Sequence, residues 1–202
     1  MVMHKVMPFR RNGGELIQAV IWFCDLRDFT AISDRALPAK VVEMLDLYFD
    51  RVGGAVTAQG GEVLKFIGDA VLVISPVGVD PNTACAHALL AAADALEAIN
   101  QLNRSQQLES VLAIGIALHV GEVMYGNIGS RERLDFTVIS SAVNETCRLE
   151  ALCKTMKTPL MLSKPFANAL TNEDLVDLGP QVLKGVTSPV RVFSLRRYCQ
   201  TD

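Results

Sequence analysis

The feature that most constrains the fold is an uninterrupted apolar run at residues 19–24, which stops abruptly at Asp25. A continuous apolar run of this length is typical of a strand that is buried on both faces. Side chains of a strand alternate between its two faces, so Cys24 should point away from Asp25 and into the core. The run therefore predicts a central strand that carries a carboxylate at its end.

A helix pattern follows this strand. Pro38 suits the first turn of a helix, and apolar residues then recur every three or four positions as far as Val56. Gly60-Gly61 is expected to stop the helix. The pattern predicts one amphipathic helix between the first strand and the next β-type segment.

The next segment predicts a β-hairpin. Residues 62–67 and 70–75 are β-type runs, and Gly68-Asp69 between them is a hairpin signal. Further elements are then expected in this order: a helix at 80–103, a strand at 110–120, Gly121, a partner strand at 122–127, a strand at 133–139, a helix at 142–153, and short strands around a helix at 164–170.

This order of elements predicts an α+β fold in which helices pack on a largely antiparallel sheet. The chain has 202 residues, half of them apolar, which suits one domain with a sizeable core. Residues 1–14 are polar and contain glycine, so we expect a leader or linker there and the folded domain at 15–202.

Charge and cysteine content exclude several classes of protein. The net charge is −3, which argues against a nucleic-acid binder with a basic face. The five cysteines are odd in number and form no CxxC, so neither a disulfide framework nor a zinc site is expected, and a reducing cytoplasm fits best. No apolar segment approaches the roughly 18 residues that a membrane span needs.

The strongest local signal of chemistry is a pair of aspartates. Asp25 lies where a buried strand ends, and Asp69 lies at the tip of the hairpin. If the hairpin lies beside the first strand, both carboxylates reach one edge and can hold two Mg²⁺ ions about 3.5–4 Å apart, as in phosphoryl and nucleotidyl transfer. On spacing alone, the simpler explanation is favoured, in which Asp25 caps the next helix and Asp69 fills a turn.

Three sequence blocks together resemble the catalytic domains of class III nucleotide cyclases. The blocks occur in the family's order, within a resemblance that covers roughly residues 16–196: FCDLRDFT at 23–30, KFIGDA at 65–70, and DFTVI at 135–139 followed by AVN at 142–144 and RLE at 148–150. The resemblance implies the class III cyclase fold, a ferredoxin-like (palm-like) sheet covered by helices. It also implies an adenylate cyclase that converts ATP to 3′,5′-cyclic AMP and pyrophosphate.

The resemblance implies two divalent metal ions, Mg²⁺ or Mn²⁺, bound by Asp25, Asp69 and the carbonyl oxygen of Leu26. It also implies that Lys65 and Thr137 read the purine. A lysine can donate to N1 of adenine, whereas guanylate cyclases usually have Glu at the position of Lys65. Thr at the position of Thr137 resembles a bacterial subgroup of adenylate cyclases.

The resemblance implies that two further residues take part in catalysis. Asn144 and Arg148 are four residues apart and so share one helix face. In the family, the Asn orients the ribose and the Arg stabilises charge on the α-phosphate, a role that suits a permanently charged fork of donors. The reaction is attack of the 3′-hydroxyl on the α-phosphorus, and no side-chain general base is evident.

The resemblance also implies that Lys184 binds the triphosphate. Three departures from the family pattern weaken the expectation for this part of the site. Val186 follows where many relatives have a second lysine, Glu122 stands where some have arginine, and Ser140-Ser141 replaces a more usual Gly-Asp.

The resemblance also implies a homodimer with shared sites. Asp25 and Asp69 would come from one subunit, and Lys65, Thr137, Asn144 and Arg148 from the other. A fused or upstream regulatory domain is possible. Three alternatives stay open: a guanylate or dual-specificity cyclase, a catalytically inactive cyclase fold that binds nucleotide, and another metal-dependent nucleotidyl transferase.

Overall fold

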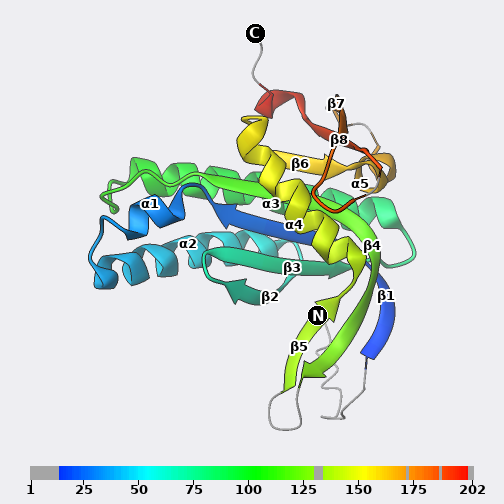
Figure 1. Ribbon diagram of the computed structural model, residues 1–202, viewed down its shortest axis with the longest axis horizontal. Helices are drawn as coiled ribbons and strands as arrows, with labels where there is room; N and C mark the ends of the chain where they lie inside the picture. The colour runs from blue at the N-terminus through cyan, green and yellow to red at the C-terminus, as the bar shows by residue number, and fades with distance from the viewer. Residues whose placement is uncertain (1–13, 130–133, 172, 187, 200–202) are drawn as a thin grey trace.

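The computed structural model describes residues 14–129, 134–171, 173–186 and 188–199. One eight-stranded sheet runs through them in the order β2-β3-β1-β4-β6-β8-β7, with β5 paired to β4 (Figure 1). Only β4 and β6 pair in parallel among the described strands, so the expected largely antiparallel α+β fold is confirmed. The strands are β1 (Gly14–Leu26), β2 (Glu62–Ile67), β3 (Ala70–Pro76), β4 (Ile114–Gly129), β5 (Leu134–Ile139), β6 (Leu160–Ser163), β7 (Leu175–Gln181) and β8 (Val190–Leu195).

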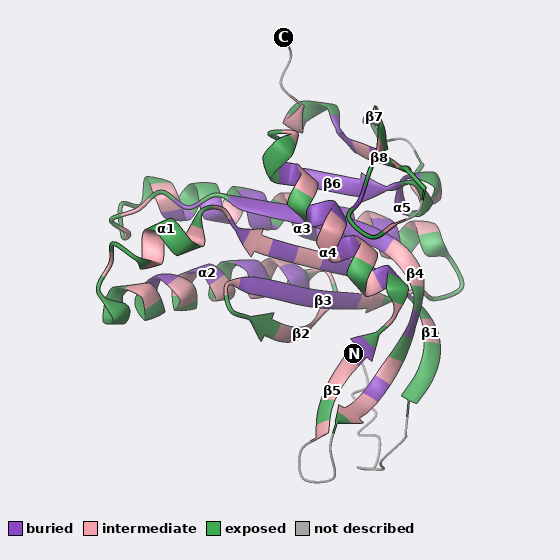
Figure 2. Cartoon of the chain, viewed as in Figure 1, coloured by how far each residue is buried: buried purple, intermediate pink, exposed green. Residues whose placement is uncertain are grey.

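Helices cover both faces of the sheet. On one face, α2 (Pro38–Ala58) and α3 (Pro81–Arg104) bury a large core that includes Trp22 and Cys24 of β1. On the other face, α4 (Ser141–Thr155) packs over smaller clusters around Ile21 and Leu149. β3, β6, the second half of β1 and the first half of β4 are accordingly mostly buried, whereas the other halves of β1 and β4 are largely exposed or half-buried (Figure 2). The prediction that Cys24 points into the core is confirmed.

Shorter elements complete the chain. The helix α5 (Lys164–Ala169) follows β6 and buries Phe166, as the tail pattern predicted. The one-turn helix α1 (Phe29–Ser33) after β1 was not expected from the sequence. A 3₁₀ turn at Arg196–Tyr198 ends the described chain. Apart from Gly14, which begins β1, the expected leader at 1–14 lies outside the described residues.

The strand prediction after residue 110 was wrong in one respect. The sequence indicated two partner strands separated by Gly121, but β4 runs unbroken from Ile114 to Gly129, and Gly121 pairs with Ala19 of β1. A Cβ on Gly121 would lie 2.6 Å from the Cβ of Ala142. The glycine therefore allows the start of α4 to approach the sheet closely, rather than forming a turn.

None of the helices in the described part of the chain is both long enough and apolar enough to cross a membrane.

Candidate active site

The two aspartates of the sequence pattern meet in the structure. β3 pairs with β1 so that Val71 lies opposite Cys24, which brings the tip of the β2–β3 hairpin beside the end of β1. Ile67 and Ala70 pair across the hairpin and leave Gly68-Asp69 as its two-residue turn. Gly68 has a φ of 65°, which a residue without a Cβ adopts readily. The fold therefore places the carboxyl groups of Asp25 and Asp69 close enough for each to influence the charge of the other.

The surroundings of Asp25 disfavour its charged form. Burial is the largest cause, followed by the neighbouring carboxyl group of Asp69, and together they raise the pKa of Asp25 to about 7. One carboxylate oxygen of Asp25, Oδ1, is buried without a hydrogen-bond partner. A divalent cation would neutralise the pair and occupy that oxygen.

These donors fit a hard divalent cation. Mg²⁺ prefers oxygen ligands, takes one or two carboxylates from protein, and fills its remaining positions with water and substrate phosphates. Asp25 and Asp69 offer two carboxylates, and the Leu26 carbonyl oxygen as a further ligand stays a prediction. Among the described residues there is no group of three or more His, Cys, Asp or Glu side chains that could hold a metal by themselves.

Lys65 lies beside the strand that carries Thr137. The Lys65 ammonium donates a hydrogen bond of 3.1 Å to a carboxylate oxygen of Asp135 on β5. Asp135 and Thr137 are two positions apart on that strand and so project from the same face. The structure thus holds Lys65 at the strand that carries Thr137, and the role of both residues as readers of the purine is still a prediction. The sequence pattern did not indicate the contact with Asp135.

The helix α4 presents the two expected catalytic residues. Ser140 is its N-cap, and the Ser140 hydroxyl accepts a hydrogen bond from the Val143 N–H. The unusual Ser140-Ser141 pair is thus compatible with a well-capped helix. Asn144 is exposed and Arg148 is half-buried on this helix.

The loop with Lys184 lies against α4. Gly185 has a φ of 74°, and a Cβ there would lie 3.4 Å from the Arg148 guanidinium. The backbone next to Lys184 is therefore close to Arg148, and a role for Lys184 at the triphosphate stays a prediction. Among the described residues, the side chains of Asn144, Arg148 and Lys184 have no hydrogen bond or ion pair. Glu122 is exposed on β4, and the Val186 N–H closes a turn onto the Leu183 carbonyl oxygen at 3.0 Å.

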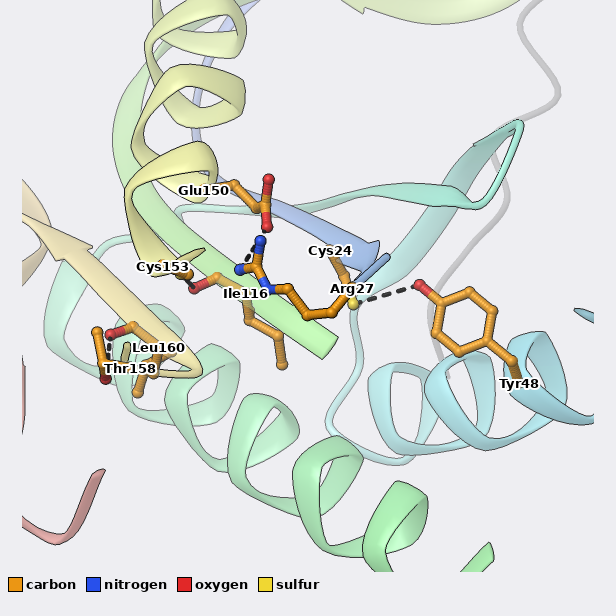
Figure 3. A network of polar contacts seen from close by, with 8 residues as sticks. All are labelled: Cys24, Arg27, Tyr48, Ile116, Glu150, Cys153, Thr158 and Leu160. Atoms are coloured by element: carbon orange, nitrogen blue, oxygen red, sulfur yellow. Dashed lines mark hydrogen bonds and ion pairs between the residues drawn. The ribbon is translucent and has the colours of Figure 1, made fainter. Parts of the chain in front are cut away.

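Sequence reasoning missed a buried ion pair next to Asp25. Arg27 reaches from the end of β1 to Glu150 of α4, and the two charged groups are 2.8 Å apart (Figure 3). Both residues belong to the motif blocks quoted above, but nothing in their spacing indicated that they meet. Gly115, which the β1–β4 register places opposite Asp25, leaves the space for the Arg27 guanidinium.

Comparison with known proteins gives a consistent result. The model of a family described as the adenylate and guanylate cyclase catalytic domain matches residues 15–196. An adenylate cyclase of Anabaena cylindrica is 31% identical over 186 residues, which are 87% of this chain and 36% of the relative. The chain thus spans about a third of the length of that curated relative.

Solved structures of cyclases share the fold. A bacterial light-regulated adenylyl cyclase superposes with a TM-score of 0.84 at 25% identity, over 94% of this chain and 55% of that one. A guanylyl cyclase superposes with a TM-score of 0.79 at 28% identity, over 91% of this chain and 93% of that one. Overall likeness therefore does not separate ATP from GTP as the substrate.

Proposed function

Because the chain belongs to the family of adenylate and guanylate cyclase catalytic domains, we propose that it is an adenylate cyclase that converts ATP to 3′,5′-cyclic AMP and pyrophosphate. The observation that carries the choice of ATP is Lys65, whose ammonium lies at β5 on the side of Thr137. An ammonium has donors only, so it suits the N1 acceptor of adenine and not the N1–H of guanine.

Asp25, Asp69 and the Leu26 carbonyl oxygen would hold two Mg²⁺ or Mn²⁺ ions. Bound there, the metals would lower the pKa of the attacking hydroxyl and neutralise charge on the triphosphate. The support for this proposal is the proximity of two carboxyl groups, one of which has a buried oxygen with no partner. Two half-buried carboxylates that lie close together repel each other unless a cation or a proton lies between them.

The other residues would bind and orient the substrate. Lys65 and Thr137 would hydrogen-bond the purine, and Asn144 would hold the ribose so that its 3′-hydroxyl faces the α-phosphorus. Arg148 would donate to the α-phosphate oxygens as their charge grows, and such a donor is worth about 10²–10³ in rate. Lys184, on the loop that lies against α4, would contact the leaving pyrophosphate. The residue that accepts the hydroxyl proton stays unassigned.

We further propose that the protein is a homodimer whose two sites are each shared between subunits. Asp25 and Asp69 would come from one subunit, and Lys65, Thr137, Asn144 and Arg148 from its partner. In support, the side chains of Asn144 and Arg148 have no hydrogen bond or ion pair with any residue in the described part of their own chain. A cytoplasmic location and a fused regulatory domain stay predictions.

The activity is tested by incubating the purified protein with ATP or GTP and with Mg²⁺ or Mn²⁺, and by identifying the product. Cyclic AMP from ATP, with little cyclic GMP from GTP, is the expected outcome. Cyclic GMP as the main product would favour the guanylate cyclase alternative. A folded dimer that binds ATP but forms no cyclic product would favour the inactive, nucleotide-binding alternative.

Shared sites are tested by mixing two inactive variants, Asp25→Ala and Arg148→Ala, under conditions that allow subunits to exchange. A mixed dimer has one doubly defective site and one intact site. With random exchange about half of the dimers are mixed, so about one quarter of the wild-type activity should return. Verified mixed dimers without activity would contradict the shared arrangement.

A further inference from the structure

A buried ion pair joins the segment that follows Asp25 to the helix α4, which carries Arg148. The side chain of Glu150 is only 5% exposed, and its carboxylate lies 2.8 Å from the Arg27 guanidinium. Arg27 is two residues beyond Asp25, and Glu150 is two residues beyond Arg148. The pair therefore joins the two segments that hold these two residues.

The space for this pair is provided by a glycine. A Cβ on Gly115 would lie 1.5 Å from the Arg27 guanidinium and 2.5 Å from the Glu150 carboxylate. Gly115 pairs with Asp25 across β1 and β4, so the Arg27 guanidinium lies beside the residue pair that includes Asp25. Figure 3 shows Arg27 extending across β4 toward Glu150.

A second, exposed ion pair reinforces the first. Lys154, four residues after Glu150 and so on the same face of α4, lies 2.6 Å from the Asp28 carboxylate. Asp28 has a left-handed φ of 55°, and it directly follows Arg27. Arg27 and Asp28, which follow β1 in the sequence, thus each form an ion pair with a residue of α4, and these two residues lie one turn apart.

We propose that the Arg27–Glu150 pair is a positioning element for catalysis: it sets the Asp25 carboxylate at the end of β1 relative to Arg148 on α4. This inference rests on the proposed function. In a dimer with shared sites, Asp25 and Arg148 of one chain serve different sites, so the pair links the two sites of the dimer. Loss of the pair in one chain then affects both sites, each in a different way.

Burial of this pair is not explained by stability alone. Well-packed apolar side chains of similar volume often replace a buried ion pair with no loss of stability. The charges of Arg27 and Glu150 attract each other across 2.8 Å, although the two atoms of the pair do not have hydrogen-bond geometry, and this attraction holds the end of β1 against α4. Such an attraction suits a residue pair that keeps Asp25 and Arg148 in fixed positions relative to each other.

The first test uses a substitution that keeps the volume. Glu150→Gln removes the charge, and Glu97→Gln is the matched control, because Glu97 is in an exposed ion pair with Arg104 on α3. The measurement is calorimetric binding of 3′-deoxy-ATP, which lacks the nucleophile, in the presence of Mn²⁺. We expect the affinity for 3′-deoxy-ATP to fall about tenfold in Glu150→Gln and to stay unchanged in the control. Residues that orient metal ligands typically contribute about 10–100-fold to metal affinity or activity.

The second test separates positioning from general stability. It uses mixed dimers of an Asp25→Ala chain with an Arg148→Ala chain, which have one intact site. Glu150→Gln in the chain with the intact Asp25 should raise the Mn²⁺ concentration for half-maximal activity about tenfold and leave kcat at saturating Mn²⁺ unchanged. Glu150→Gln in the chain with the intact Arg148 should lower kcat about tenfold without changing the Mn²⁺ requirement.

The outcomes are distinguishable. Active mixed dimers in which both placements of Glu150→Gln have the same effect, or no effect, would overturn the positioning role. Mixed dimers that are inactive without Glu150→Gln would instead refute the shared sites. If Glu150→Gln does not yield folded dimers, the double variant Arg27→Met with Glu150→Met removes both charges and keeps apolar packing. It should fold and show the same two losses, and wild-type behaviour would reject the proposal.

Discussion

The ammonium nitrogen of Lys65 on β2 lies 3.1 Å from a carboxylate oxygen of Asp135 on β5, although the two residues are 70 positions apart in the sequence. Lys65 is therefore held at the strand that carries Thr137. If Lys65 reads the purine, Asp135 orients it for that contact.

Asp135→Asn should weaken the use of ATP without weakening the fold. An exposed ion pair contributes at most about 1 kcal/mol, so we expect KM for ATP to rise by up to about fivefold and kcat to change little. Steady-state kinetics together with a thermal melt check this expectation. A fall in kcat at constant KM would show that Asp135 acts on the chemical step instead.

Replacement of both purine-reading residues should alter the choice of base. Lys65→Glu with Thr137→Cys removes the donor to adenine N1 and leaves polar groups unpaired, so kcat/KM for ATP should fall about 10²-fold. Some use of GTP is expected, but not a full switch, because the supporting residues are unchanged. A double variant that keeps the wild-type preference for ATP would exclude these two residues as readers of the base.

Loss of either metal carboxylate should abolish cyclisation and leave the fold intact. A metal contributes several kcal/mol of transition-state stabilisation, and about 4 kcal/mol corresponds to about 10³-fold in rate, so Asp69→Ala should lower kcat at least that much. Asp46→Ala on the exposed side of α2 is the control and should be fully active. Near-normal turnover of Asp69→Ala with Mn²⁺ supplied would be incompatible with the metal site.

Two glycine substitutions should have opposite effects on stability. Gly115→Ala puts a Cβ where the Arg27 guanidinium lies and separates the guanidinium from Glu150. The free energy of unfolding should therefore fall by about 3–5 kcal/mol, the usual cost when a buried charge loses its partner. Gly54→Ala in α2 meets nothing within 4 Å and should stabilise the protein by about 0.5–1 kcal/mol. Denaturant unfolding of both variants checks the contrast, and equal effects would contradict it.

His119 should make the protein less stable in acid. Burial lowers the pKa of His119, while the carboxylate of Glu145 on α4 partly opposes this shift, and the exposed Glu122 lines the same pocket. The unfolded chain then binds the proton more readily than the folded one. The stabilising contribution is present above the unfolded pKa of about 6.5 and is lost as the pH falls below it, by at most about 1.4 kcal/mol per pH unit.

The check is the difference in unfolding free energy between the wild type and His119→Gln at about pH 7.5 and about pH 5.5. Glutamine does not titrate, so the advantage of the wild type should shrink at the lower pH. A difference that is independent of pH would show that His119 binds its proton equally well in the folded and unfolded states.

Local signals in the sequence were sufficient for most elements, whereas the metal role of Asp25 and Asp69 came from the family resemblance and stays a prediction. The apolar run before Asp25 predicted β1, because a strand buried on both faces needs apolar side chains at every position. Gly68-Asp69 predicted the hairpin, because few residues adopt its turn geometry. Both signals depend on neighbours in the chain, so they can be recognised without the tertiary structure.

Long-range register decided the rest. Only the pairing of β1 with β4 puts Gly115 opposite Asp25 and leaves room for Arg27 to reach Glu150. The sequence indicated that Gly121 separates two strands. In the structure the strand is unbroken, and the absence of a Cβ on Gly121 lets Ala142 of α4 pack closely against it. The sequence by itself thus determined which elements form and which carboxylates end them. The tertiary structure alone decided which distant side chains meet, because such contacts depend on strand register and helix packing rather than on the conformational preferences of adjacent residues.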